Sequence, residues 1–488
     1  EGEVSSSDLD IAPDHPHRIR YVPHPHMVTV PMMCARLAMG EGPDATVSYS
    51  WDHLRPWAQG MNRPSAMFAS PDRFAGRGAT TMGIFAPSMP EFIEPNSRVG
   101  HTPLEVAAGE QIDLAAEVAA LDARQDETAL VAVQRWFGEH GVTEPNPLPH
   151  GEDLVDEVAF DMGAYLQSLW VEDEEKWVPI FFGPPDWRTP QWKPDFLYDV
   201  RMGAALTDDP ALARRLRERD ERVVELSGIA PVAGDMGFQY SGPAAHVVGE
   251  ANAVSGLIAS QREDGSWRFQ ARVETSGVFK GRDYGELGPN DAAEVGTCAR
   301  NAWRVLRLAR MTGDESAREA GLNALAFMDR FRVPRAAQVW EVPVHTPDIL
   351  ASADACEAYL EGYLLTGDRA YLDSAVYWAW TGLPFVYTWD VPGFEFLEYA
   401  SIPVFGATWY TGSWFGRPVQ WNGLVYARAL LQLAEYDDSL DWRTVAEGIT
   451  VSAMYQQYTD AEHQALWPDS VSGIDRGDSG ANFAPRRI

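Results

Sequence analysis

The stretch VLRLARMTGDESAREAGLNAL, residues 305–325, decides the fold, because the turn Thr312-Gly313-Asp314 separates two segments with the apolar period of amphipathic helices. The same turn returns as Thr366-Gly367-Asp368, 54 residues later, and a related turn, Thr207-Asp208-Asp209, lies 105 residues earlier. Three further turns follow apolar segments, at Asp173, at Asp264-Gly265 and at Asp437-Asp438. A period of about 50–55 residues is typical of a repeat of helical hairpins.

Six turns predict six inner helices, near residues 153–170, 193–206, 245–260, 291–311, 349–365 and 420–435. The segments after Asp173 and after Trp267 are rich in Trp, Phe and Val and look extended, so two of the six outer helices are expected to be hairpins or loops instead. The number of hairpins indicates a ring. We therefore predict a mainly α fold, with an (α/α)6 toroid at residues 150–460 and a C-terminal tail at 461–488.

The N-terminal part has a different pattern. Residues 1–26 are polar and rich in Pro and His, which predicts an extended arm, and residues 27–125 look like short strands between Pro and Gly turns, which predicts a β-sandwich domain. The clearest strand pair is 104–107 with 112–118, joined by Ala108-Gly109-Glu110. The linker at 126–149 contains an amphipathic helix at about 127–139, whose apolar face holds Leu130, Val133, Trp136 and Phe137.

The composition excludes several partners. The net charge of −32, from 71 acidic and 39 basic residues among 488, repels nucleic acid and anionic lipid. No run of about 18 apolar residues exists, so we expect no membrane span. The chain starts at Glu1 and shows no apolar signal segment, which fits a trimmed chain, and we expect a secreted or periplasmic protein whose export signal has been removed.

Metal and thiol chemistry lack a sequence signal. The three cysteines have no metal-ligand spacing and no surroundings that would activate a thiol: Cys34, Cys298 and Cys356. No His-Glu-x-x-His motif is present. We therefore expect no cofactor, apart from a structural Ca²⁺ that acidic loops could hold.

The segments that precede the inner helices should form one end of the ring, opposite the Asp-rich turns. They combine aromatic, carboxylate and amide side chains, which gives these candidate site residues: Trp192, Asp195, His246, Asn290, Asp291, Trp340, Glu341, His345, Asp348, Tyr410, Trp414, Arg417, Trp421 and Asn422. Aromatic rings offer flat apolar faces to the C–H faces of sugars, and nearby polar groups serve the hydroxyls. The pattern predicts a carbohydrate site.

Hydrolysis of a glycoside needs two carboxyl groups, one to protonate the leaving oxygen and one to activate water or attack the sugar. Our preferred catalytic residues are Asp348, Glu341 and Asp291, with His345 beside them and Asp195 next. Asp195, Asp291 and Asp348 follow Pro or Asn at helix starts, so each has an alternative role as an N-terminal cap. Glu341 lies in a loop beside Trp340 and has no capping role. The environment decides which group is acid and which is base.

Two other functions fit the same residue types. A polysaccharide lyase would use His345 or His246 as base and Tyr399 or Tyr410 as acid in β-elimination. Three polar residues would hold a uronate carboxylate: Asn290, Asn422 and Arg417. A glycan-binding protein would use the aromatic loops without cleaving anything. The candidate face has few Arg and Lys, which favours hydrolysis over elimination.

The combination of a β-sandwich and six helical hairpins resembles the (α/α)6-toroid carbohydrate-active enzymes. This group includes glucoamylase-like glycoside hydrolases, unsaturated glucuronyl hydrolases and toroid polysaccharide lyases. The resemblance implies a carbohydrate substrate and, for a hydrolase, inversion at the sugar carbon. One local motif, Gln261-x-x-x-Gly265-x-Trp267, resembles the QW motif of triterpene cyclases. It occurs once, and the Asp-x-Asp-Asp motif of those enzymes is absent. The simpler interpretation is a tight turn against which Trp267 packs.

Overall fold

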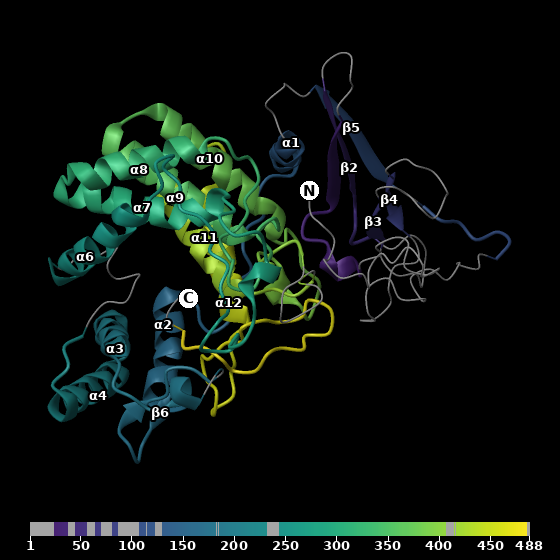
Figure 1. The fold of residues 1–488 in the computed structure, drawn as a ribbon. Coiled ribbons are helices and arrows are strands. Elements are labelled where there is room, and N and C mark those ends of the chain that lie inside the picture. The colour runs from purple at the N-terminus through teal and green to yellow at the C-terminus, as the bar shows by residue number, and fades with distance from the viewer. Residues whose placement is uncertain are drawn as a thin grey trace.

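The structure is a computed structural model of the chain. The residues that it describes are 24–37, 44–55, 64–69, 81–85, 107–113, 115–122, 129–181, 183, 185–231, 244–406, 414 and 416–485. Within them the protein is mainly helical, with a small sheet near the N-terminus (Figure 1).

All six predicted inner helices are present. They are α2 (Leu154–Gly163, continued by the π-turn Ala164–Ser168), α3 (Pro194–Leu206), α6 (Ala244–Ser260), α7 (Val295–Thr312), α9 (Ile349–Thr366) and α11 (Gln420–Leu433). Four outer helices follow: α4 (Pro210–Ser227), α8 (Glu315–Met328), α10 (Arg369–Gly382) and α12 (Trp442–Tyr455).

The two exceptional hairpins are also confirmed. After α2 comes a short antiparallel pair, β6 (Trp170–Val171) with β7 (Lys176–Trp177). After α6 the chain runs from residue 261 to residue 294 without an α-helix and contains a single 3-10 turn, Tyr284–Glu286.

The repeated turn works through local hydrogen bonds. Gly313 has φ +74°, a left-handed conformation that suits Gly and ends α7. Thr312 Oγ1 accepts the backbone N–H of Asp314 at 3.3 Å, and the carboxylate of Asp314 accepts the N–H of Ala317 at 2.9 Å and caps α8. The turn at residues 366–368 repeats these bonds with Gly367 at φ +74°. The short motif is therefore enough to join two antiparallel helices.

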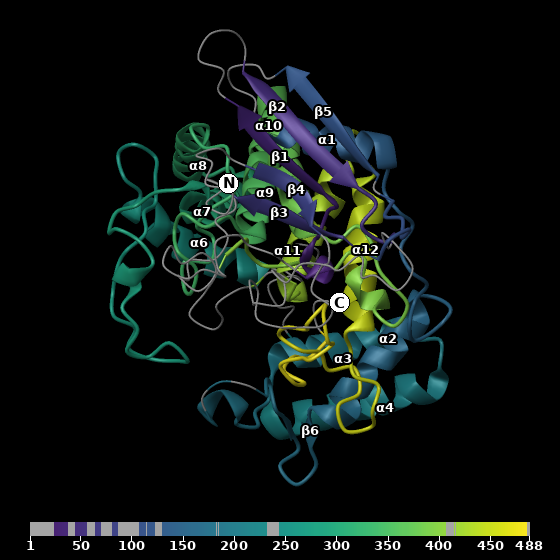
Figure 2. The ribbon, with the colours of Figure 1, turned by 90° about the vertical axis from the view of Figure 1, so that its right-hand side faces the viewer.

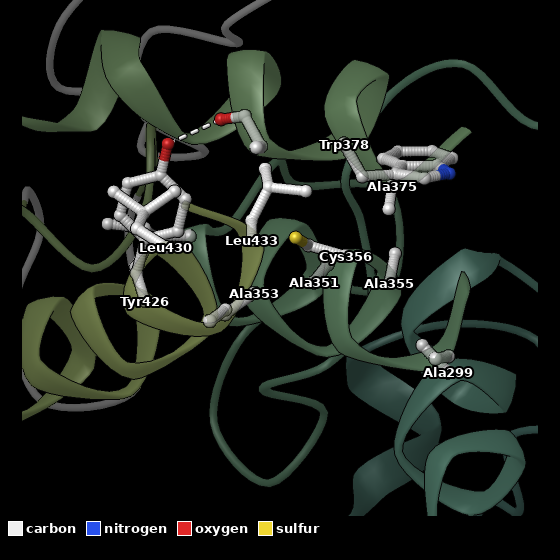
Figure 3. Packing of buried hydrophobic residues seen from close by; sticks show 14 of the residues in the cluster. Ala299, Ala351, Ala353, Ala355, Cys356, Ala375, Trp378, Tyr426, Leu430 and Leu433 are labelled. Atoms are coloured by element: carbon white, nitrogen blue, oxygen red, sulfur yellow. Dashed lines mark hydrogen bonds between the residues drawn. The ribbon is translucent and has the colours of Figure 1, made fainter. Parts of the chain in front are cut away.

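Two apolar cores organise the helices. The first joins α6 to α12 and reaches α1, and its centre is α9, where every residue from Ile349 to Gly362 is buried. Figure 3 shows Cys356 among Ala351, Ala353 and Leu433 in this core, where it acts as a small apolar side chain. The second core joins α2, α3 and α4 and includes Leu466 and Ala484 of the C-terminal segment.

The described contacts follow part of a ring. Helix α2 packs on α3, α6 packs on α7, and α9 packs between α7 and α11. Among the described residues, comparable packing is not seen between α3 and α6, or between α11 and α2. Closure of the toroid therefore stays a prediction.

The N-terminal strands form small antiparallel sheets. Strand β2 (Ala45–Trp51) lies between β1 (Met32–Leu37) and β5 (Ala116–Asp122), and β3 (Ser65–Ala69) pairs with β4 (Thr81–Phe85). A sandwich of two packed sheets is not confirmed. The strand predicted at 112–118 starts at Ala116 instead, because residues 110–113 are exposed and the pairing partner is β2. The turn at Ala108-Gly109 is present, and Leu104 lies outside the described residues.

Helix α1 (Leu130–His140) links the two parts. It contacts both β2 and α10 (Figures 1 and 2). Val133 and Phe137 are its large buried residues, and the rings of Phe137 and Trp380 are 6.1 Å apart. The end of the predicted arm also packs on the helices, where Tyr387 Oη donates to the carbonyl oxygen of His26 at 2.8 Å. Within the described part of the chain, no helix has the length and apolar character needed to cross a bilayer.

Candidate functional site

A cavity of about 460 Å³ lies between the two cores. Its walls come from the loop before α9, the start of α11, the start of α3, the loop after α6 and the C-terminal segment after α12. The C-terminal segment passes between the cores, since Leu466 packs in the second and Trp467 in the first (Figure 2). The lining residues that carry chemistry or aromatic surface are Trp187, Lys193, Phe196, Phe279, Trp340, Glu341, Trp414, Trp421, Trp467, Asp469 and Phe483.

Glu341 is the first of two carboxyl groups in this cavity. Its side chain is buried, and its Oε2 atom has no hydrogen-bond partner. Burial, together with the nearby charge of Asp469, raises the pKa of Glu341 to about 8, although a hydrogen bond from the Trp340 side chain opposes the rise. This group therefore holds a proton at neutral pH and has one buried oxygen without a hydrogen-bond partner.

Asp469 is the second carboxyl group. Burial raises its pKa, and the hydrogen bond from Trp421 opposes that rise because it stabilises the ionised form. The indole Nε1 of Trp421 donates to Oδ1 of Asp469 at 3.1 Å. The backbone N–H of Asp469 donates to Oδ1 of Asn482 at 3.1 Å, which fixes the loop. The two carboxyl groups thus share one cavity but have different neighbours.

Aromatic rings enclose these carboxyl groups. Trp340 and Trp421 lie nearly parallel, with ring centroids 6.3 Å apart and an interplanar angle of 29°. Trp414 is buried beside them in a small apolar cluster with Val419. These faces lower the local dielectric, and this explains why burial dominates the pKa of Glu341.

Lys193 is the only Lys or Arg among the described lining residues. Its Nζ is 3.4 Å from Oδ2 of Asp195 and 5.6 Å from the ring centre of Phe196. The cavity therefore has little positive charge to offer an anionic ligand.

Four of the predicted site residues meet in this cavity: Trp340, Glu341, Trp414 and Trp421. Three others lie near its walls. Asp195 pairs with Lys193, Arg417 donates to Ser470 Oγ at 3.3 Å, and Asn422 is buried at the start of α11. The loops before α9 and α11 therefore converge on one cavity, as the sequence predicts for loops before inner helices.

The other predicted catalytic residues lie elsewhere. Asp348 is fully buried and caps α9, where its carboxylate accepts the N–H groups of Ala351 at 2.8 Å and Ala337 at 3.1 Å. Asp291 is half exposed and pairs with Arg262 at 2.8 Å. These contacts favour structural roles for both carboxylates.

Five predicted residues add nothing to the described cavity walls. His345 is exposed, and so is Asn290, which accepts the N–H of Ala271 at 3.0 Å. Trp192 donates its indole N–H to the carbonyl oxygen of Glu175 at 3.0 Å. Tyr410 and the side chain of His246 lie outside the described residues. Roles for these five stay predictions.

The sequence interpretation missed Asp469. This residue follows Trp467-Pro468, so an aromatic residue and a Pro-Asp pair were available as a signal. The signal was overlooked because residues 461–488 were predicted to be a tail outside the repeats. The structure places this segment against both cores.

No family model matches the chain, and no curated protein matches its sequence. Solved structures do match. They include unsaturated glucuronyl hydrolase from Streptococcus agalactiae, with 11% identity over 71% of this chain and 94% of that chain and a TM-score of 0.41. An unsaturated glucuronyl hydrolase specific for heparin has 13% identity, coverage of 69% and 95%, and a TM-score of 0.41. The enzyme from Bacillus sp. GL1 has 12% identity, coverage of 68% and 93%, and a TM-score of 0.41.

Proposed function

We propose that this protein is a glycoside hydrolase in which Glu341 is the general acid and Asp469 the general base. The observation that carries the proposal is one aromatic cavity with two carboxyl groups whose surroundings differ. Glu341 has a pKa raised to about 8 and an oxygen without a partner, as a proton donor requires. Burial raises the pKa of Asp469 as well, and the Trp421 indole N–H opposes that rise by favouring the ionised form, which a base requires.

The reaction follows from these two states. Glu341 gives its proton to the glycosidic oxygen while the bond from that oxygen to the sugar carbon breaks. A water molecule attacks the same carbon from the opposite face and gives its proton to Asp469. Glu341 ends ionised and Asp469 ends protonated, and exchange with solvent restores both. We expect inversion at the sugar carbon, as the resemblance to toroid hydrolases implies.

The aromatic rings would hold the sugar for this step. Trp340 and Trp421 present flat faces beside the two carboxyl groups, and such faces suit the C–H surfaces of a pyranose. The proposed chemistry is complete with these side chains, so no cofactor is required. A structural Ca²⁺ and a secreted or periplasmic location stay predictions.

The lyase alternative receives less support. Elimination needs a His or Tyr near the substrate, and neither residue type is among the described residues that line the cavity. The substrate carboxylate would also need neutralisation, for which Lys193 is the only described cation.

The test is an assay on a panel of neutral and uronic-acid glycosides, with two signals. New reducing ends without the ultraviolet absorbance of an unsaturated uronate would support hydrolysis, and a rise in that absorbance would support the lyase instead. Variants Glu341→Gln and Asp469→Asn should each reduce turnover by about 10²- to 10⁴-fold. The matched control is Glu398→Gln, a buried carboxyl outside the cavity whose pKa burial and Asp390 raise to about 7. Equal losses in all three variants would contradict the proposal.

A further inference from the structure

The two ends of the cavity differ in character. At the inner end lie the carboxyl groups and the buried rings of Trp414 and Trp467, which are 5% and 1% exposed. At the mouth lie Trp187 and Val278, which are 38% and 42% exposed, together with Phe279. Large apolar side chains exposed at the entrance of a cavity mark a contact surface for a ligand.

The mouth is held in place by short-range structure. Trp187 belongs to the 3-10 turn Pro185–Arg188, and its ring lies against Gly183, where an added Cβ would come within 2.4 Å of the indole. Val278 and Phe279 lie at the tip of a closed loop, because the N–H of Gly281 donates to the carbonyl oxygen of Glu274 at 2.8 Å. Gly277, at φ +69°, brings this loop against the Trp187 ring. Two segments far apart in sequence thus form one apolar rim.

This rim has few groups that could serve sugar hydroxyls. Among the described lining residues, the charged side chains are Glu341, Asp469 and Lys193, and the last is already paired with Asp195. The indole N–H of Trp421 is taken by Asp469. A second sugar ring at the mouth would gain few hydrogen bonds from these side chains and would keep its hydroxyls in water, whereas an apolar group there is stabilised by burial.

We propose that the mouth binds the leaving group and selects apolar alcohols, so that the substrates are aryl or alkyl glycosides rather than long polysaccharides. This inference rests on the proposed hydrolysis at Glu341 and Asp469. The sugar occupies the inner end between Trp340 and Trp421. The aryl or alkyl part then lies against Trp187, Val278 and Phe279.

The experiment uses the full chain and methyl, butyl, hexyl and octyl glycosides of each sugar in the panel, together with the matching disaccharides. In the unmodified protein kcat/KM should rise about fourfold for each methylene that the rim buries. In Trp187→Ala and Phe279→Ala this dependence should flatten, so that kcat/KM for the octyl glycoside falls by a larger factor than kcat/KM for the methyl glycoside. The control Tyr436→Ala removes an aromatic ring that is 41% exposed and does not line the cavity, and it should keep the full dependence.

The outcomes separate the two proposals. Hydrolysis without dependence on alkyl length, or faster cleavage of disaccharides, would overturn the apolar leaving-group site and leave the glycoside hydrolase intact. No hydrolysis of any glycoside would overturn the proposed function and this inference with it. Flattening in Tyr436→Ala as well as in the two rim variants would show a general loss of structure, and would also overturn the assignment.

Discussion

The variant Trp421→Phe removes one hydrogen bond and keeps an aromatic ring. The lost bond is the 3.1 Å contact from the indole Nε1 to Oδ1 of Asp469. A hydrogen bond to a charged group contributes about 1.5–3 kcal/mol, and about 1.4 kcal/mol corresponds to one pH unit in an ionisation equilibrium. The bond favours the ionised carboxylate, so its loss makes Asp469 harder to ionise. The acidic limb of the pH profile should therefore move upward by about one to two pH units.

The assay is kcat/KM against pH on the best glycoside from the panel. The alkaline limb should stay near pH 8, because it belongs to Glu341, and so the active range should narrow from its acidic side. The matched control is Trp192→Phe, which removes an indole N–H bond of 3.0 Å to the carbonyl oxygen of Glu175 outside the cavity. An unmoved acidic limb in Trp421→Phe, or an equal shift in the control, would refute Asp469 as the base.

Three further outcomes follow from the same contacts. Glu341→Gln should lower kcat/KM by about 10²- to 10⁴-fold and abolish the alkaline limb, because the protonated form below about pH 8 is the active one and is lost as pH rises; a surviving limb in the pH profile would contradict this. Asp348→Ala should lower the free energy of unfolding by about 2 kcal/mol or more, because two buried N–H groups lose their acceptor, and urea denaturation measures it. Glu357→Gln should lower the free energy of unfolding by about 3–5 kcal/mol, because the buried guanidinium of Arg428 loses its charged partner. In the unmodified protein Nε and Nη2 of Arg428 donate to the Glu357 carboxylate at 2.8 and 2.7 Å. A loss below about 1 kcal/mol would contradict this prediction.

The helices were predictable because their signals are local. Each Thr-Gly-Asp turn carries its own hydrogen bonds and its own left-handed Gly, so seven or eight residues are enough to specify it. The same holds for the two missing outer helices, where Trp and Val replace the helical pattern within a short window. Closure of the ring and packing of the sheets depend on contacts between distant segments, which no local pattern encodes.

The candidate site was predictable only in part for the same reason. Glu341 and Trp421 stood out because aromatic and polar residues gather in single loops. Asp348 is also an acidic residue and lies in the same loop as Glu341. Its carboxylate, however, accepts a backbone N–H at the start of its own helix. Asp469 is the opposite case, since it follows Trp467-Pro468 but lies in a segment that was predicted to be a tail outside the repeats. It reaches Glu341 because the C-terminal segment packs between two cores that are themselves far apart in the chain.

The acidity of the chain and the lining of the cavity both favour protonated carboxyl groups and disfavour anionic ligands. A net charge of −32 favours protonation of buried carboxyl groups and repels anionic ligands, whereas the cavity lining that the structure describes provides Lys193 as its one cation. Glu341 keeps its proton for two reasons, burial within the aromatic walls and the nearby charge of Asp469. The same field makes a polyanionic chain a poor ligand for this cavity. The proposed general acid, protonated near neutral pH, and the proposed preference for uncharged substrates thus both depend on negative charge in and around the cavity.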